Sequence, residues 1–140
     1  MPSKQTVRKA KQELREGKSP KTAAGEFVHE EIEHVRRGKH GARSPQQAIA
    51  IGLSEARRSG IPVPPPKKNA SAATKKRAKR DYEKGQSSGT STKKTSSRRS
   101  KARVQALKRE PKSTASHAAL SRHAKTAARK RKGTSARKAA

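Results

Sequence analysis

The segment His-Glu-Glu-Ile-Glu-His at residues 29–34 comes closer to a metal site than any other motif in the sequence. A zincin motif, His-Glu-x-x-His, places two imidazoles four residues apart on one face of a helix. His29 and His34 are five residues apart, which turns their side chains away from each other by more than about 100° on a helix. This spacing argues against a zincin-type metal site.

A di-iron site is the second metal chemistry to consider, because Glu31-x-x-His34 matches its Glu-x-x-His motif. Such sites need a second copy of the motif and two further Glu residues on other helices, and the sequence offers no such set. We therefore interpret residues 29–34 as a charged helix surface with pairs such as His29/Glu33 and Glu33/Arg37. No metal and no cofactor are expected.

Nucleophilic and phosphate-transfer chemistries also lack their motifs. The chain has no cysteine, its only aspartate is Asp81, and neither a Gly-x-Ser-x-Gly elbow nor a phosphate-binding Gly-x-x-x-x-Gly-Lys loop occurs. We predict that the protein is not an enzyme and has no small-molecule substrate.

The segment from residue 36 to 44 concentrates positive charge between two expected helices. Its two glycines allow close approach to a surface, and it adjoins a helix start, where free N–H groups attract phosphate. We predict a nucleic-acid backbone clamp here, and the alternative is a solvated turn whose charges serve solubility. The predicted binding residues of this loop are Arg36, Arg37, Lys39, His40 and Arg43.

Most remaining cations lie beyond residue 66, where 25 Lys/Arg face three acids, against 13 Lys/Arg and seven Glu before it. Blocks of like charge bind phosphates without reading base sequence. The chain has one Phe and one Tyr, which are few aromatic side chains for stacking on the bases of a single strand. The further predicted binding residues are Arg57, Arg58, Lys67, Lys68, Lys75, Lys76, Arg77, Lys79, Arg80, Lys93, Lys94, Arg98, Arg99, Lys101, Arg103, Lys125, Arg129, Lys130, Arg131 and Lys132.

Three helices are expected to position the loop, over about residues 3–16, 20–37 and 45–59. Ser-Pro opens the second and third, and a glycine follows each of the three. The predicted fold class is mostly α, a helical hairpin or three-helix domain over residues 1–60 whose first helix is loosely packed or frayed. Its few large apolar side chains suggest that it needs a homodimer or its ligand for stability.

A proline spacer at 61–66 and a basic tail at 67–140 complete the expected organisation. Few large apolar side chains are available to offset the entropy of ordering the tail, so it is predicted to be largely disordered. Two helical patterns, about residues 98–110 and 116–132, are expected to fold on binding. No apolar run is long enough to span a membrane.

Residues 17–66, with Gly25-Glu26-Phe27-Val28-His29, Gly38-Lys39-His40-Gly41-Ala42-Arg43-Ser44 and Gln46-Gln47-Ala48-Ile49-Ala50-Ile51-Gly52-Leu53-Ser54, resemble an uncharacterised family of small basic bacterial proteins of DNA-binding type. The Lys/Ala/Arg-rich tail resembles bacterial linker-histone-like proteins. The resemblance implies a bacterial, cytoplasmic, DNA-associated protein and supplies no site residues.

Charge and resemblance together predict a sequence-nonspecific, nucleoid-associated, histone-like protein of the cytoplasm that binds duplex DNA through phosphate contacts. An RNA- or ribosome-associated basic protein is the alternative, since the same charges suit ribosomal RNA. A polycation acting on acidic partners or membrane surfaces is a third class, but the tail lacks the Trp/Phe/Leu face of an interfacial helix.

Overall fold

The computed structural model describes residues 2–68, 70–87 and 96–139, with side chains to residue 133, and this part of the chain contains helices and no strands. The elements are α1 (Lys4–Arg15), α2 (Pro20–Arg36), α3 (Pro45–Arg58), α4 (Ala72–Gln86), α5 (Ser97–Arg109), the 3₁₀ turn η1 (Ser113–Ala115) and α6 (His117–Ala139). The predicted mostly α fold class is confirmed. None of the described helices is long and apolar enough to span a membrane.

The helix ends follow the local signals in the sequence. Ser19 and Ser44 cap α2 and α3 by accepting hydrogen bonds from backbone N–H groups three residues later, each at 3.2 Å, with proline at the first helical position. Gly17, Gly38 and Gly60 adopt positive φ angles of 75–87° after α1, α2 and α3, a conformation that glycine reaches without steric cost.

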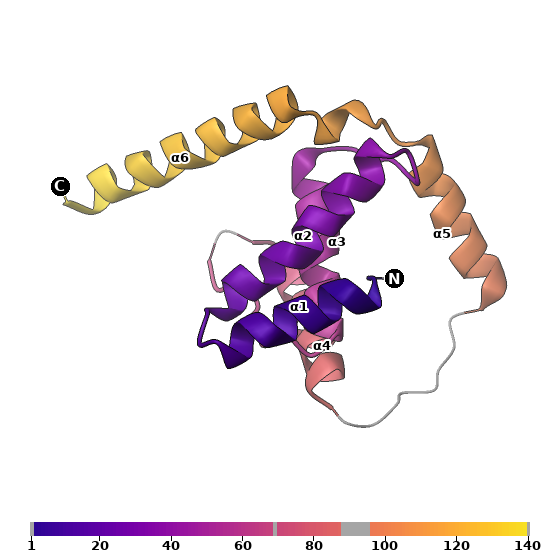
Figure 1. Cartoon of the computed structure of the whole chain (residues 1–140). Coiled ribbons are helices and arrows are strands. Elements are labelled where there is room, and N and C mark those ends of the chain that lie inside the picture. Colours follow the sequence, from indigo (N-terminus) through magenta and orange to yellow (C-terminus); the bar gives the residue numbers. More distant parts are fainter. Residues whose placement is uncertain (1, 69, 88–95, 140) are drawn as a thin grey trace.

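The first core cluster joins α1, α2 and α3 around the fully buried Phe27 (Figure 1). Ala10 of α1 is also fully buried, and Lys9 forms an ion pair with Glu26 of α2 at 2.9 Å. The expectation that the first helix is loosely packed or frayed is therefore wrong. The reason is that a small side chain, Ala10, lets α1 approach α2 closely enough for Val7 and Leu14 to join the core.

Helices α2 and α3 cross at Gly52, where the absence of a side chain lets the two backbones approach closely. A Cβ atom at Gly52 would lie 2.7 Å from Val28 Cα and 3.0 Å from the Phe27 carbonyl oxygen. The predicted hairpin of the second and third helices is thus held by direct backbone contact.

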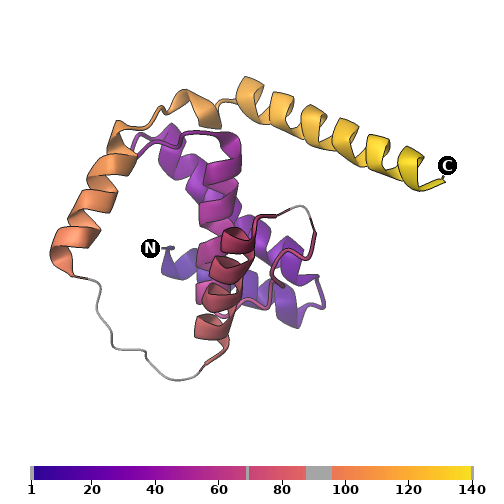
Figure 2. The same cartoon turned by 180° about the vertical axis from the view of Figure 1, so that it is seen from behind.

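The segment after α3 returns along the core, with Ile61 and Val63 buried among its residues. Helix α4 then packs against α3, as Figure 2 shows from behind. Ala78 is buried at this contact, and Ser54 of α3 donates a hydrogen bond to Asp81 of α4.

The prediction of a largely disordered tail is wrong for the described residues, because 72–86, 97–109 and 117–139 are helical in the chain alone. The sequence argument counted large apolar side chains, whereas this region docks through small ones and backbone hydrogen bonds. Ala115 lies in a second core cluster with Val35, Ala42 and Ala48. From this anchor α6 projects away from the helical body (Figure 1).

Candidate nucleic-acid interface

The loop between α2 and α3, residues 37–44, is covered on one side by the end of α5 and the chain that connects α5 to α6. Gly41 N–H donates to the Leu107 carbonyl oxygen at 2.8 Å, and Ala42 N–H donates to that of Pro111 at 3.0 Å. The Thr114 hydroxyl donates to the Ala42 carbonyl oxygen at 2.9 Å. The surface that Gly41 approaches closely is therefore part of the same chain, since a Cβ there would overlap the Glu110 carbonyl oxygen.

Arg36, at the end of α2, has hydrogen-bond partners within the protein. Its Nε donates to the Ala115 carbonyl oxygen at 2.8 Å, and its Nη1 donates to Glu33 at 3.0 Å. This arrangement holds η1 against α2. The side chain of Arg36, which was predicted to contact phosphate, is thus already engaged within the protein.

The other cations of the loop differ in how far they reach into solvent. The side chains of Arg37 and Arg43 are 72% and 81% exposed, although each has a carboxylate nearby, Glu33 at 3.7 Å and Glu110 at 3.5 Å. Lys39 is exposed. His40 is half-buried and turns inward, with its Nε2 atom 3.4 Å from Glu31.

Arg57 and Arg58, neighbours at the end of α3, lie in opposite environments. Arg57 is 8% exposed and donates hydrogen bonds to the carbonyl oxygens of Val63 and Pro64, at 3.2 and 3.4 Å. Burial lowers the pKa of its guanidinium, with Asp81 opposing the shift. Arg58 is exposed beside Asp81 at 3.7 Å. Only Arg58 of the two is accessible to a phosphate.

Helix α4 and the residues before it carry the next group of predicted binding residues. Lys75 is half-buried there, and the others are exposed, namely Lys67, Lys68, Lys76, Arg77, Lys79 and Arg80. Lys79 has a partner on its own helix, Glu83 at 3.8 Å. This surface is basic but not free of acids.

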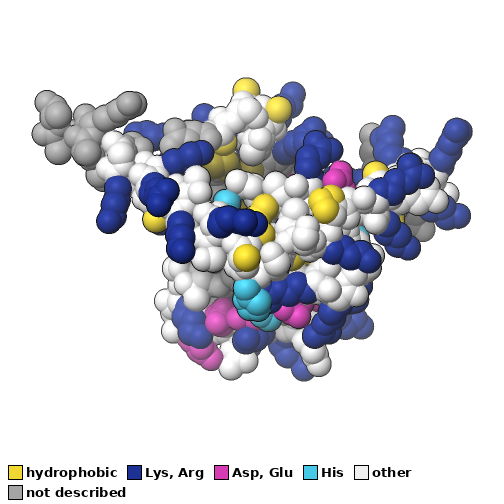
Figure 3. All heavy atoms as spheres, turned by 90° about the horizontal axis from the view of Figure 1, so that it is seen from above, with side chains coloured by type: hydrophobic (Ala, Val, Ile, Leu, Met, Phe, Trp, Pro, Cys, Tyr) yellow, Lys and Arg dark blue, Asp and Glu magenta, His cyan; other side chains and the backbone are white. Residues whose placement is uncertain are grey.

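Helices α5 and α6 contain no acidic residue at all. Helix α5 carries six Lys/Arg and is exposed along most of its length, and α6 carries eight. The predicted residues here are exposed: Arg98, Arg99, Lys101, Arg103, Lys125, Arg129, Lys130, Arg131 and Lys132. Lys93 and Lys94 fall outside the described residues. Figure 3 shows Lys and Arg side chains gathered towards both ends of the upper face, over α6 and α5.

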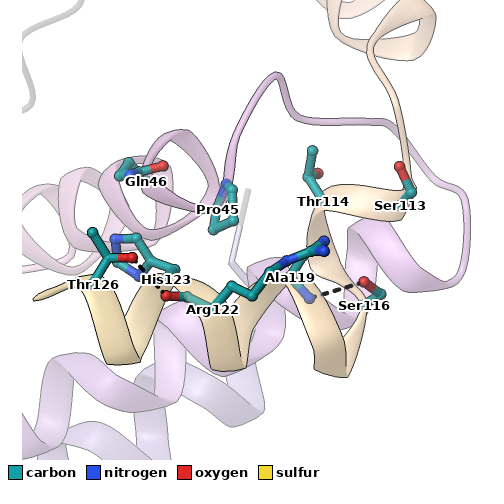
Figure 4. Close-up of a pocket in the computed structure, with 9 residues that line it drawn as sticks. All are labelled: Pro45, Gln46, Ser113, Thr114, Ser116, Ala119, Arg122, His123 and Thr126. Atoms are coloured by element: carbon teal, nitrogen blue, oxygen red, sulfur yellow. Dashed lines mark hydrogen bonds between the residues drawn. The ribbon is translucent and has the colours of Figure 1, made fainter.

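A groove of about 440 Å³ separates the start of α6 from the start of α3. Its lining residues are Pro45, Gln46, Ser113, Thr114, Ser116, Ala119, Arg122, His123 and Thr126, drawn in Figure 4. None of them is acidic, and hydroxyl, guanidinium and imidazole groups can all donate to an anion. Arg122 and His123 were not among the predicted binding residues, because their proximity to α3 depends on the docking of η1.

The fold and these surfaces define a small, highly basic protein whose described residues form only helices and their connections, with a compact body and a projecting cationic helix. The model of a family of unknown function (DUF6496) matches residues 3–69, which covers α1, α2, α3 and the segment after them. The match supports the family part of the resemblance and carries no information on DNA binding. The searches of curated proteins and of solved structures gave no match.

Proposed function

We propose that this protein is a sequence-nonspecific DNA-binding, nucleoid-associated protein that holds duplex DNA through phosphate contacts. The observation that carries the proposal is the charge distribution of α5 and α6. The sequences of these two helices contain fourteen Lys/Arg and no acidic residue. Elsewhere in the protein, acidic side chains form ion pairs with part of the Lys/Arg. Helices α5 and α6 have no acidic side chain of their own for such pairs.

The geometry of α6 suits a duplex. At about 1.5 Å per residue its 23 residues extend for about 35 Å, close to one turn of B-DNA. Arg122, Lys125, Arg129 and Lys132 recur at intervals of three and four residues and therefore share one face of the helix. A basic face on a projecting helix can follow a phosphate backbone without contacting base edges.

The groove of Figure 4 offers a second contact near the body. An approaching phosphate would meet Arg122 and His123 beside the start of α3, where the helix dipole favours negative charge. Phosphate bound there would connect the projecting helix to the helical body. The loop cations Arg37, Lys39 and Arg43 add a flanking positive surface.

The test is the salt dependence of binding by the full chain to a duplex of about 30 base pairs. Ten phosphate contacts predict a slope near −9 in a plot of log K against log salt concentration, since each contact contributes about −0.9. A slope near zero overturns the proposal. Competition between the duplex and a structured RNA at fixed salt decides the class of nucleic acid: preferential displacement by the RNA would favour the ribosome-associated alternative.

A further inference from the structure

The structure brings together three metal-ligating side chains that the sequence motif at 29–34 did not identify as a set. Glu31 and His34 lie one turn apart on α2, and His40 reaches them from the loop after α2. One potential ligand atom from each of the three residues lies within 4.8 Å of those of the other two. His29 is exposed and lies five residues from His34, so it does not face the same site. His40 supplies the second imidazole instead.

Glu31 is the central group of this cluster. It is 2% exposed, its Oε1 atom lies 3.4 Å from His40 Nε2, and its Oε2 atom lies 3.8 Å from His34 Nδ1. In a tetrahedral zinc site with ligand distances of about 2.0–2.2 Å, neighbouring ligand atoms lie about 3.4 Å apart. The distance from His40 Nε2 to Glu31 Oε1 matches that value, and His34 Nδ1 lies beside the other oxygen of the same carboxylate.

The buried Oε1 atom of Glu31 has no hydrogen-bond partner among the described residues. Buried carboxylate oxygens in native proteins are nearly always hydrogen-bonded or bound to a cation, because leaving them unpaired costs free energy. Among the described residues, this buried oxygen therefore lacks the partner that its burial requires.

Each histidine has an oxygen atom near its second ring nitrogen, and that of His40 lies within hydrogen-bond distance. The Nδ1–H of His40 donates to the Gly41 carbonyl oxygen at 3.0 Å, which leaves the lone pair of Nε2 facing Glu31. His34 has Glu30 Oε1 3.7 Å from its Nε2 atom, on the side away from Glu31. A carbonyl or carboxylate behind each imidazole is the usual arrangement around metal-binding histidines.

We propose that Glu31, His34 and His40 form a binding site for one divalent transition metal of the zinc class, held by two imidazole nitrogens and one carboxylate. Zinc accepts this donor set with a fourth position left for water. A cation between His40 and Glu31 would bind both the lone pair of His40 Nε2 and Glu31 Oε1, the oxygen without a hydrogen-bond partner among the described residues. Softer metals that select thiolates have no suitable ligand here, because the chain lacks cysteine.

Metal binding at this site would act on the docked C-terminal region. His40 directly precedes Gly41 and Ala42, whose backbone N–H groups hold the chain at Leu107 and Pro111. A metal that fixes His40 to α2 therefore also fixes the loop on which this docking depends. We expect the metal to raise the thermal stability of the full chain.

The experiment is a zinc titration of the full-length protein, freed of nucleic acid and treated with a chelator, followed by calorimetry. One zinc ion per chain is expected. His40→Asn and Glu31→Gln should each weaken zinc binding by more than about tenfold, the order of loss seen when a metal site is disturbed. His29→Asn is the matched control, because it removes an exposed histidine from the same helix, and it should bind zinc like the parent.

Cobalt provides an independent readout, since Co²⁺ in a tetrahedral nitrogen and oxygen environment absorbs visible light. The absorption should appear with the parent and with His29→Asn and be lost with His40→Asn. Helical circular dichroism of each metal-free variant establishes that it is folded. Absence of zinc binding by the parent at about 100 μM zinc, or an equal loss in His29→Asn and His40→Asn, overturns the proposal. Nucleic acid takes no part in these measurements, so their outcome is independent of the DNA-binding proposal.

Discussion

Arg36 donates a hydrogen bond from Nε to the carbonyl oxygen of Ala115, 79 positions further along the chain, at 2.8 Å. This bond joins the end of α2 to the turn that precedes α6. The helical body and the projecting helix are therefore connected by a specific contact as well as by the chain. A residue predicted to bind phosphate is a tether between the two parts.

Replacing Arg36 should loosen this tether. In Arg36→Gln the backbone N–H groups of Gly41 and Ala42 are expected to exchange with solvent faster, because they donate to the segment that Arg36 holds in place. Hydrogen exchange followed by NMR measures the effect. Arg37→Gln removes the same charge from the adjacent, 72% exposed residue and should leave these amides protected. Equal exchange in the two variants would contradict the structural role of Arg36.

Two helical glycines should respond oppositely to alanine. Gly52→Ala places a methyl group against the backbone of α2 at Val28 and should destabilise the protein by about 1–3 kcal/mol, as overpacking does. Gly25→Ala, with nothing within 4 Å, should be neutral or stabilise by up to about 1 kcal/mol through helix propensity. Thermal unfolding followed by circular dichroism gives both values. A stabilising Gly52→Ala would show that the two helices are further apart.

The neighbouring arginines of α3 offer a second matched pair. Arg57→Ala leaves the buried carbonyl oxygen of Val63, and also that of Pro64, without its arginine donor, which should cost about 1–3 kcal/mol of stability. Arg58→Ala removes an exposed side chain beside Asp81 and should cost about 1 kcal/mol or less. Urea unfolding of the two variants measures the difference. Equal costs would indicate that the Arg57 contact contributes little.

The packing of α4 on α3 can be followed through Tyr82, the only tyrosine of a chain without tryptophan. A Cβ at Gly85 would overlap the Arg57 carbonyl oxygen, so Gly85→Ala should separate α4 from α3 and expose the half-buried Tyr82. Acrylamide quenching of its fluorescence should increase. Gly133→Ala, which has open space around it, is the control and should leave the quenching unchanged.

The proposed role of α6 predicts that charge position matters in DNA binding. Changing Arg122, Lys125, Arg129 and Lys132 to Gln should make the salt slope less negative by about 3–4, at about 0.9 per phosphate contact. The control changes four exposed cations of α1 that have similar helical spacing: Lys4, Arg8, Lys11 and Arg15. An equal change in slope for both variants would mean that binding depends on net charge alone, without a defined interface.

The first three helices could be predicted from the sequence because their ends are marked locally, by Ser-Pro caps and by glycines with positive φ. Helix α4 could not, since its contact depends on Ala78 and Gly85, small residues that give no apolar periodicity. The docking of Ala115 could not be predicted from the sequence for the same reason. In the candidate metal site, residues 29–34 drew attention to His34, but the approach of His40 depends on the loop conformation, which no local pattern specifies.

The docking of residues 107–117 on the loop after α2 also has a consequence in time. During translation, α3 is complete at Arg58, about 50 residues before the segment that covers the loop begins at Leu107. At about 5–20 residues per second, that interval lasts several seconds, on the order of 3–10 s. For this period the nascent chain presents Arg36 without its Ala115 acceptor and the backbone N–H groups of Gly41 and Ala42 without theirs. The nascent protein therefore passes through a stage in which these donors are open to solvent, whereas the finished molecule covers them.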